Sequence, residues 1–363
     1  MSVLTKLRQR AMTPFAATSR GWIGIDIGSR SIKLAQVERV GDQFHFGNRW
    51  TVTRPENLLA SNVDMPNALA GKPLGLAELR ELFSRSECAA ALSMSFHTLR
   101  SIELPAASAE EMRDMVNEEL AAEASNAESD CVFDFWNTHE ATDEAAHVTT
   151  LSMPTSVATG VAKDLLQAGY ECQVLDGLPC ALARAVTMAN DDHDSPVAAL
   201  DLGDGEFTFV LIARGQPLYT RVLRGGGLCA LLQPLKDALN LSHEQAMQLL
   251  IRYAVGSGEH GGRAMNSGPA QLLEQPMMLL VQELKRTLDF VAQPVHREKP
   301  AELILFGGGA SIRNLSSYLS QHLGLPTRNW RLPSSTPQFA TDDARYGVAA
   351  ALSVLRWEQR TCS

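Results

Sequence analysis

The chain lacks the features that mark several common protein classes. No stretch of its 363 residues approaches the roughly 20 consecutive apolar residues that a membrane-spanning helix needs. Basic residues are not in excess: 32 Lys and Arg stand against 41 Asp and Glu, and the net charge of -9 argues against broad nucleic-acid binding, which requires a basic surface. The six cysteines show no CxxC pair and no regular framework, which is typical of reduced thiols in a cytosolic protein.

The remaining composition is that of a soluble globular protein. Hydrophobic residues make up 45% of the chain and charged residues 20%, and the length of 363 residues is sufficient for two or more domains. The first twenty residues differ from the rest, because they carry Lys6, Arg8, Arg10 and Arg20 and no acidic residue. We interpret residues 1–20 as a flexible basic tail, with a basic amphipathic helix on an anionic membrane as the alternative for residues 1–15.

Two glycine-marked segments share one pattern. In Gly21–Glu38 and in Val197–Gly227, an apolar run ends in Asp-x-Gly, a short polar turn follows, and a second apolar run leaves the turn. This pattern predicts a β-hairpin with an aspartate at its mouth, Asp26 in the first segment and Asp201 in the second. The run Gln43–Thr53 can supply a third antiparallel strand to the first hairpin. The repeat predicts two homologous half-domains that face one cleft.

The chemistry of the two turns suits a nucleotide with a bound cation. Glycine lets a phosphate approach the backbone, and an aspartate can hold Mg²⁺ through water. A third segment, Leu303–Pro326, reads as strand, triple glycine and helix, which suits the sugar and base. Asp26 and Asp201 are the candidate metal ligands. The candidate cofactor-binding residues are Asp26, Gly28, Ser29, Arg30, Ser31, Lys33, Asp201, Gly203, Thr208, Gly307, Gly308 and Gly309.

Longer blocks of the sequence, in this order, resemble one known family. The blocks are IGIDIGSRSIKLAQVE, SFHTLRSIELPAASAEEMRDMVNEEL, SMPTSVATGVAKDLLQAGYECQVLDGLPCALARA, GQPLYTRVLRGGG, LSHEQA, ELKRTLDF and FGGGASIRNLSSYLSQHLGLP. Together they resemble the PilM family of type IV pilus assembly proteins, which belongs to the actin-like ATPase superfamily. The resemblance implies an α/β, actin-like fold, in which two RNase-H-like half-domains carry an inserted small α/β module and a helical insertion.

The resemblance also implies how the chain is divided. Residues 21–86 and 176–196 would form the first actin-like subdomain, and residues 197–227 and 300–363 the second. The inserted α/β subdomain would cover residues 87–175, and the helical insertion residues 228–299. Residues 1–20 remain outside these units as the basic tail.

A partner and a location follow from the resemblance. Such a protein lies in the cytoplasm beneath the inner membrane, in a pilus or related type II secretion assembly complex. It binds the cytoplasmic peptide of a bitopic, PilN-type protein and contacts the membrane mainly through that partner. A small inserted sheet has edges that can pair with a peptide backbone, and an acidic helix follows its strand at Thr98–Glu103. The candidate partner-binding residues are Ser95, Thr98, Arg100, Glu111 and Glu118.

The chain departs from the nucleotide-binding pattern of this superfamily in three of five elements. Asp204 and Glu206 occupy the second turn, where small hydroxylated residues are usual, and their charges would face a polyphosphate. Leu178 replaces an acidic residue that helps to orient the attacking water. Met247 and Leu250 replace a Glu and a Lys that commonly contact the ribose. We therefore expect ATP and Mg²⁺ to bind weakly or not at all, with hydrolysis near background.

Two functions remain open at this point. The first is a structural adaptor that binds a pilus or secretion partner with little or no hydrolysis, and the substitutions favour it. The second is a working ATPase whose cycle drives polymerisation or partner exchange, which the retained aspartates and glycines keep open. A small-molecule kinase of the same superfamily is a more distant third, because no sequence block for a sugar site is visible.

Overall fold

The structure is a computed structural model of the chain. It describes residues 18–54, 75–123, 130–138, 145–190, 195–253, 255, 267–293, 299–335 and 340–358. The basic tail expected at residues 1–20 therefore lies almost entirely outside the described residues.

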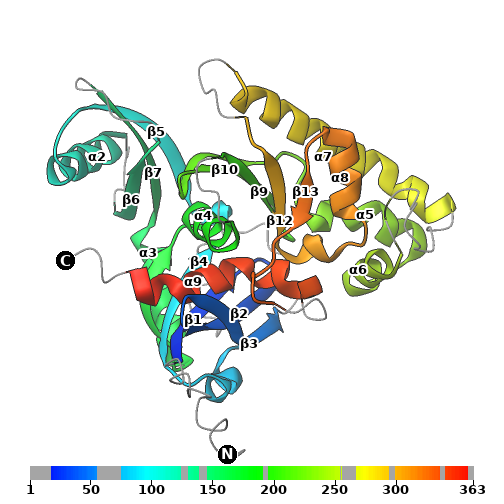
Figure 1. The fold of residues 1–363 in the computed structure, drawn as a ribbon, viewed down its shortest axis with the longest axis horizontal. Coiled ribbons are helices and arrows are strands. Elements are labelled where there is room, and N and C mark those ends of the chain that lie inside the picture. The colour runs from blue at the N-terminus through cyan, green and yellow to red at the C-terminus, as the bar shows by residue number, and fades with distance from the viewer. Residues whose placement is uncertain are drawn as a thin grey trace, which may run out of the picture.

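The first half-domain is built on a five-stranded sheet in the order β3-β2-β1-β4-β8 (Figure 1). Strands β1 to β3 form an antiparallel meander, while β4 and β8 extend the sheet in parallel beyond β1. Alternation in β1 directs Ile23, Ile25 and Ile27 into a core with α3 (Thr155–Gln167). The bounds of the strands are Ser19–Ile27 for β1, Ser31–Val40 for β2, Gln43–Thr53 for β3, Glu87–Leu92 for β4 and Glu171–Asp176 for β8.

The second half-domain repeats this topology in a sheet of order β11-β10-β9-β12-β13. Its first three strands again form an antiparallel meander, and β12 pairs in parallel with β9. Two sheets with one strand order confirm the prediction of homologous half-domains. The bounds are Val197–Leu202 for β9, Phe207–Ala213 for β10, Gln216–Val222 for β11, Glu302–Phe306 for β12 and Thr327–Asn329 for β13.

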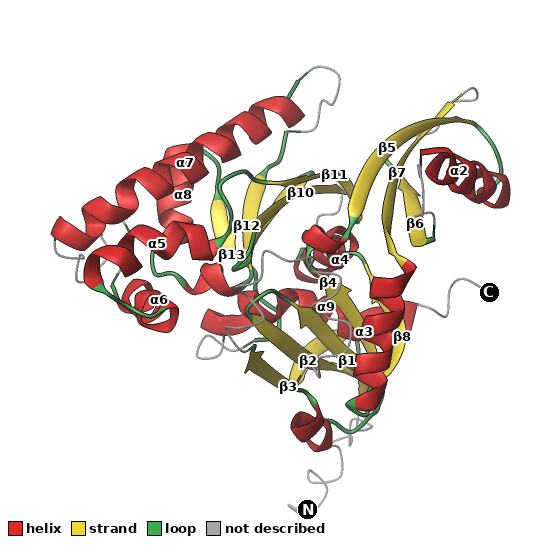
Figure 2. Ribbon diagram, turned by 180° about the vertical axis from the view of Figure 1, so that it is seen from behind, coloured by secondary structure: helices red, strands yellow, loops and turns green. Residues whose placement is uncertain are grey.

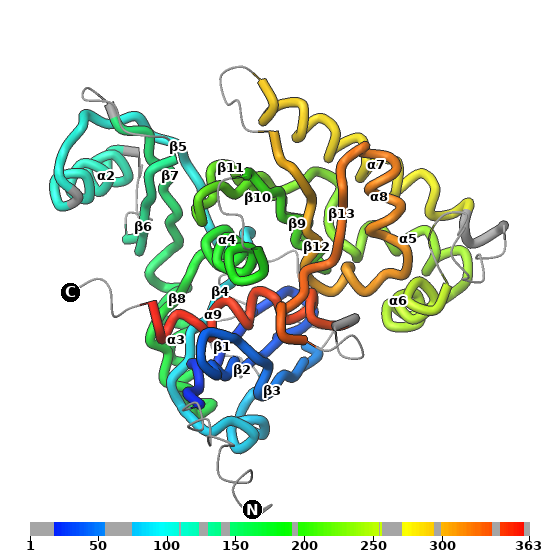
Figure 3. The backbone as a smooth tube through the Cα atoms, viewed as in Figure 1, coloured from blue at the N-terminus to red at the C-terminus, as the bar shows by residue number. Residues whose placement is uncertain are grey.

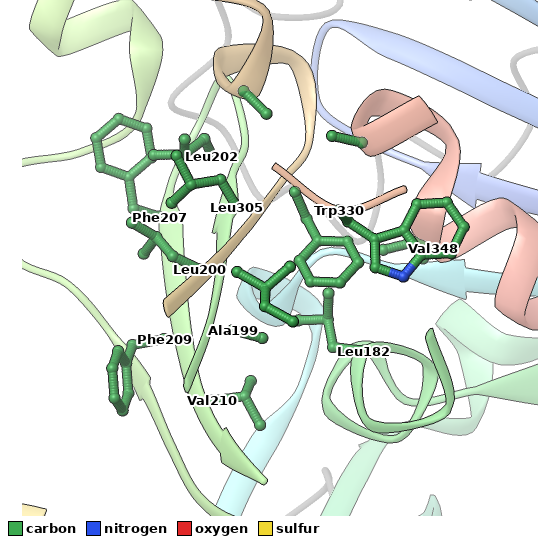
Figure 4. Packing of buried hydrophobic residues seen from close by; sticks show 14 of the residues in the cluster. Leu182, Ala199, Leu200, Leu202, Phe207, Phe209, Val210, Leu305, Trp330 and Val348 are labelled. Atoms are coloured by element: carbon green, nitrogen blue, oxygen red, sulfur yellow. The ribbon is translucent and has the colours of Figure 1, made fainter. Parts of the chain in front are cut away.

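Two helices each follow one sheet along the chain but pack on the sheet of the other half. Helix α4 (Leu178–Ala189) follows the first sheet but packs on the second, where Leu182 and Trp330 belong to one apolar cluster (Figure 4). The indole Nε1 of Trp330 donates to the carbonyl of Ala185 at 2.7 Å. Helix α9 (Gly347–Glu358) follows the second sheet but packs on β1, β2 and β4. The expectation that all of residues 300–363 belong to the second subdomain is therefore wrong for α9.

Close backbone contact explains where α9 sits. A Cβ atom on Gly24 of β1 would lie 1.8 Å from the carbonyl oxygen of Ala349. The absence of a side chain at Gly24 thus lets the helix lie directly on the strand. Ser353 of α9 also donates its hydroxyl to the Trp22 carbonyl at 2.6 Å and accepts from the Val37 amide at 2.9 Å.

The inserted module is a three-stranded antiparallel sheet of order β5-β7-β6 with α2 on one face. The expected boundaries of 87–175 are too wide, because β4, α3 and β8 belong to the first half-domain. The alanines of β4 are buried between β1 and β8, so this strand is central to the main sheet. The module's elements are β5 (Thr98–Pro105), α2 (Ala109–Glu123), β6 (Cys131–Asn137) and β7 (Ala145–Pro154).

Helices gather on the outer side of the second half-domain, opposite to the inserted module (Figures 2 and 3). Helix α6 begins with a capping box, in which the side chains of Ser242 and Gln245 bond to each other's backbone amides. In the described ranges, none of the helices has the length and apolar content that crossing a membrane requires. The bounds are Leu228–Leu239 for α5, His243–Arg252 for α6, Ser267–Val291 for α7 and Leu315–Leu323 for α8.

Candidate functional site

The turns of the two homologous hairpins have equivalent close-packed glycines. A Cβ atom on Gly28 would lie 2.9 Å from the carbonyl oxygen of Ser31, and one on Gly203 would lie 2.8 Å from that of Glu206. The repeated Asp-x-Gly pattern therefore corresponds to two turns, and neither turn has room for a side chain at its glycine. The tips of the turns also meet, since a Cβ atom on Gly205 would lie 3.0 Å from the Ser29 hydroxyl.

A cavity of about 200 Å³ lies between these turns. Eight of the twelve candidate cofactor-binding residues line it: Asp26, Gly28, Ser29, Arg30, Ser31, Lys33, Asp201 and Gly203. The sequence analysis did not assign Ser93 and Leu92 to the cavity, although both follow from the end of β4 lying beside β1. The remaining lining residues include Leu178, Asp204 and Glu206, which are three of the five substituted positions, whereas Met247 and Leu250 do not line this cavity.

The other four candidate cofactor-binding residues do not line this cavity. Thr208 is fully buried within the sheet, in register with Asp201. The triple-glycine turn packs against the end of β9: a Cβ atom on Gly307 would lie 2.5 Å from Asp201 Oδ1, and one on Gly309 would lie 2.7 Å from Leu202 Cβ. Gly307 also has a φ of +79°, so it needs glycine for its conformation. These glycines bring the turn to the cleft without forming its cavity.

A lysine ammonium lies among the carboxylates at the base of the cavity. Lys33 Nζ is 2.7 Å from Asp26 Oδ2. Burial opposes the charged form of Lys33, but the charges of Asp26 and Asp201 outweigh it and raise the pKa of the lysine. Burial raises the pKa of Asp201 to about 7 against the opposing charge of Lys33, with Asp26 and Glu206 adding to the rise. The two candidate metal ligands are thus partly neutralised by the chain itself.

Arg30 crosses the cleft from the first turn to the second half-domain. Its Nε is 3.2 Å from Asp204 Oδ2, and its Nη1 is 3.2 Å from Glu244 Oε1 at the start of α6. Asp204 Oδ1 is also 2.9 Å from His243 Nε2. Burial would raise the pKa of Asp204, but the hydrogen bond from His243 and the charge of Arg30 lower it. Asp204, predicted to face a polyphosphate, is therefore bound by cationic or hydrogen-bonding groups of the protein.

A second contact joins the halves at Glu206. The backbone amide of Ser95 donates to Glu206 Oε1 at 3.1 Å. Burial raises the pKa of this carboxyl, and the hydrogen bonds from the backbone of Ser95 and Met94 oppose the rise. Ser95 lies in the short 3-10 turn Met94–Phe96, which connects β4 to the inserted module. The sequence analysis placed Ser95 on the partner surface, whereas the structure shows it lining the cleft.

The other four candidate partner-binding residues lie in the inserted module. Thr98 and Arg100 are on β5, and Glu111 and Glu118 are on the exposed surface of α2. Glu111 has a structural role, because its carboxylate accepts hydrogen bonds from the Ser108 amide at 2.9 Å and the Ser108 hydroxyl at 2.7 Å. These hydrogen bonds lower the pKa of Glu111. They form a capping box at the start of α2.

The orientation of α2 brings its two acidic positions onto one flank. Arg113 lies over the rings of Phe133 and Phe135 of β6, at 5.6 Å and 5.5 Å from their centroids. With about 100° of rotation per helical residue, Glu111 and Glu118 fall on the flank turned away from Arg113. The acidic flank therefore faces away from β6, the strand at one edge of the module's sheet.

Comparisons with known proteins agree with this architecture. The family described as Type IV pilus assembly protein PilM matches residues 24–332. A structure titled PilM-PilN type IV pilus biogenesis complex is similar, with a TM-score of 0.74, 24% identity, and coverage of 92% of this chain and 98% of that chain. More distant is the ethanolamine utilization protein EutJ from Carboxydothermus hydrogenoformans, with a TM-score of 0.49, 14% identity, and coverage of 92% of this chain and 89% of that one.

MreB 5 of Spiroplasma citri, in a structure bound to AMPPNP, has a TM-score of 0.47 and 12% identity, and the match covers 94% of this chain and 98% of that chain. The family match extends over most of the chain, from the first hairpin through the triple-glycine turn. It agrees with the seven sequence blocks and with the paired sheets of the two halves. The chain has an actin-like fold and belongs to the PilM family of type IV pilus assembly proteins.

Proposed function

We propose that the protein is a scaffold of a type IV pilus, or related type II secretion, assembly complex, and that its nucleotide site is degenerate. Membership of the PilM family supports the scaffold role. The partner is a PilN-type bitopic protein whose cytoplasmic peptide the scaffold binds, a pairing supported by the similarity to a PilM-PilN complex. The scaffold is cytoplasmic and peripheral to the inner membrane, and it reaches the membrane chiefly through this partner.

The contacts across the cleft are the observation that supports a degenerate nucleotide site. The cavity of about 200 Å³ is smaller than the roughly 300–1,000 Å³ of usual ligand sites. Asp204 and Glu206 are held in it by Arg30 and by the Ser95 amide. A triphosphate entering here would meet these carboxylates and would have to displace their partners. The same groups that close the cleft therefore weaken nucleotide binding.

The alternative, an active Mg-ATPase, is favoured by one feature of the same cavity. Asp26 and Asp201 both line it, and both turns keep the glycine that a phosphate contact needs. If nucleotide binds, these aspartates would hold Mg²⁺, and the turn amides and Lys33 would contact the phosphates. Mg²⁺ would supply charge neutralisation for the phosphates.

Calorimetry with Mg-ATP separates the two possibilities. Each missing charged hydrogen bond costs about 1.5–3 kcal/mol, so two or three of them leave a Kd of about 0.1 mM or weaker. We expect binding at or below that strength, with hydrolysis near background. Micromolar affinity would contradict the proposal, as would steady turnover that Asp201→Ala abolishes.

We propose that the partner peptide docks on the inserted module where it meets the first half-domain. β5 is an outer strand of its sheet and pairs only with β7 among the described strands, so one edge is available for a peptide backbone. Thr98, at the start of β5, is exposed next to this junction. The acidic flank of α2 would attract a peptide that carries Lys or Arg and speed its encounter.

Charge reversal on α2 tests this docking surface. Asp114 and Glu118 are exposed one helical turn apart on this flank, and changing both to lysine spares the capping box of Glu111. The matched control is Glu274→Lys with Asp289→Lys, an equal change on exposed positions of α7 in the other half-domain. Capture of the PilN-type peptide should weaken several-fold at low salt in the α2 variant alone, with little change in Tm.

Two outcomes would contradict this docking surface. The first is equal capture by the α2 variant and the unmodified protein. The second is a loss confined to the α7 control, which would move the peptide site to the helical insertion. A loss in both variants would indicate a response to net charge rather than to a local surface.

A further inference from the structure

Two cysteines lie opposite each other in the first sheet. Cys88 of β4 and Cys172 of β8 are register partners in a parallel pair of strands, and both thiols are free. Neighbouring strands lie about 4.8 Å apart, and the Cα atoms of a disulfide usually lie about 4.4–6.8 Å apart. The spacing of the two cysteines across the sheet therefore suits a covalent bond.

The two thiols also lie on the same side of the sheet. Cys88 belongs to the apolar cluster on the α3 face, and Cys172 packs against the same cluster. The Cys88 thiol donates a hydrogen bond to the Cys172 sulfur, and the Cys172 thiol donates to the carbonyl of Val174 at 3.4 Å. A disulfide requires side chains that point toward a common region as well as close backbones, and this pair meets both conditions.

An extra residue in β8 gives this position room to adjust. The register pairs Ala89 with Val174 directly after the two cysteines, so Gln173 is skipped. Such a bulge disrupts the ladder locally and bends its strand. Among the described strands β8 is also the outer member of its sheet, next to α3 (Figure 2). The backbone at Cys172 can therefore shift toward β4 without pulling on another strand of the sheet.

The surroundings give the two thiols different reactivities. Cys88 is fully buried, whereas Cys172 is partly exposed, between the exposed side chains of Glu171 and Gln173. The hydrogen bond from Cys88 lowers the pKa of Cys172 against the effect of burial. The same hydrogen bond, together with burial, raises the pKa of Cys88. Because the thiolate is the reactive form of cysteine, an oxidant from solvent meets the more reactive thiol first.

We propose that Cys88 and Cys172 form a reversible disulfide when the protein meets a hydroperoxide. The Cys172 thiolate attacks one peroxide oxygen, the O–O bond breaks, and a sulfenic acid forms while the leaving oxygen takes up the thiol proton. The Cys88 sulfur then attacks the Cys172 sulfur, and hydroxide leaves and takes the Cys88 proton as water. Two thiols are thus oxidised by two electrons, and hydrogen peroxide is reduced to two molecules of water.

The disulfide closes the chain around the inserted module. The residues between 88 and 172 include the whole module, α3 and the turn Met94–Phe96. A bond around so long a loop restricts the unfolded chain, so the oxidised protein should unfold about 3–6 °C above the reduced one. It also keeps β8 attached to β4 when the outer part of the sheet opens locally. Oxidation therefore protects the edge of the first sheet.

Peptide mapping of the full chain under non-reducing conditions tests the proposal. The protein is treated with hydrogen peroxide, the remaining thiols are alkylated, and linked peptides are identified by mass spectrometry. We expect one linked pair that contains Cys88 and Cys172, loss of two hydrogen atoms from the intact mass, a higher Tm, and full reversal by dithiothreitol. Absence of this pair at a peroxide dose that oxidises Cys131 would overturn the proposal, as would a disulfide that joins either cysteine to a different one.

Single variants test the order of the two steps. In Cys88→Ala the second thiol is missing, so the sulfenic acid on Cys172 should persist and react with dimedone. In Cys172→Ala the buried Cys88 should stay unlabelled. The matched control is Cys131→Ala, because Cys131 is also a partly buried cysteine on a strand but has Pro154 as its register partner.

The control variant should form the disulfide as the unmodified protein does. Loss of the linked pair in Cys131→Ala would overturn the pairing, and dimedone labelling of Cys88 in Cys172→Ala would overturn the assigned order. If a variant does not fold, mapping of the unmodified protein still decides whether the disulfide forms.

Discussion

Replacing Arg30 with methionine tests whether charge holds the two hairpin turns together. The change keeps an unbranched aliphatic side chain and removes the guanidinium that reaches Asp204 and Glu244, each at 3.2 Å. We expect the cleft to open more often, because these contacts join the first half-domain to the second. The fold of each half should persist, since neither sheet depends on this side chain for its core.

The expected size of the effect follows from the exposure of each partner. The side chains of Arg30 and Asp204 are 15% and 14% exposed, and a hydrogen bond between charged groups contributes about 1.5–3 kcal/mol. Glu244 is 57% exposed, so its pair with Arg30 adds only about 0–1 kcal/mol. Asp204 keeps His243 at 2.9 Å, so its charge is not left without a partner. We expect about 2 kcal/mol, roughly a 30-fold change in the ratio of closed to open cleft.

Native-state hydrogen exchange measures this opening directly. Amides in the turn at residues 203–206 and in the segment 93–97 should lose about 2 kcal/mol of protection in the Arg30→Met variant. The control is Arg39→Met, whose pair with Asp42 lies at 3.3 Å on the surface and should contribute little.

A double-mutant cycle of Arg30→Met and Asp204→Asn isolates the pair, with an expected coupling of about 1.5–3 kcal/mol. A coupling below about 0.5 kcal/mol, with unchanged exchange at both segments, would refute the electrostatic clamp.

Two further predictions concern stability. Because the pKa of Asp201 in the folded protein is about 7, above the roughly 3.9 of an unfolded aspartate, its stabilising contribution is complete below about pH 4 and is lost as pH rises through about 7. As pH rises from about 5 to about 8, the free energy of unfolding measured in urea should therefore fall less for Asp201→Asn than for the unmodified protein. Parallel pH profiles of the two proteins would contradict the assigned pKa. Gly24→Ala should lower the free energy of unfolding by about 1–3 kcal/mol or more, since the new Cβ would lie 1.8 Å from the Ala349 carbonyl oxygen and push α9 off β1. Gly308→Ala, whose Cβ would meet its nearest neighbour at 3.8 Å, is the matched control, and equal loss in both variants would argue against close helix packing at Gly24.

Local chemistry made the hairpins and the fold class predictable from the sequence. The strand predicted at Gln43–Thr53 coincides with β3, and the two Asp-x-Gly segments form turns with equivalent glycine contacts. Turn conformation and strand alternation depend on neighbouring residues, so they leave a pattern in the sequence. The ordered blocks extended this pattern to the family, which the match over residues 24–332 confirms.

Only the tertiary structure decided how the halves are joined. The apolar residues of β4 and α9 could by their sequence alone be buried against either sheet; in the structure β1 contacts both elements. Arg30 and Glu244 are separated by 214 positions, and no periodicity connects them. The carboxylates that sequence reasoning expected to repel a polyphosphate are bound by residues of the protein, because folding brought Arg30, His243 and the Ser95 amide to them. Residue types can be read from the chain, but the charge balance of the cleft depends on which distant groups the fold places within hydrogen-bonding distance.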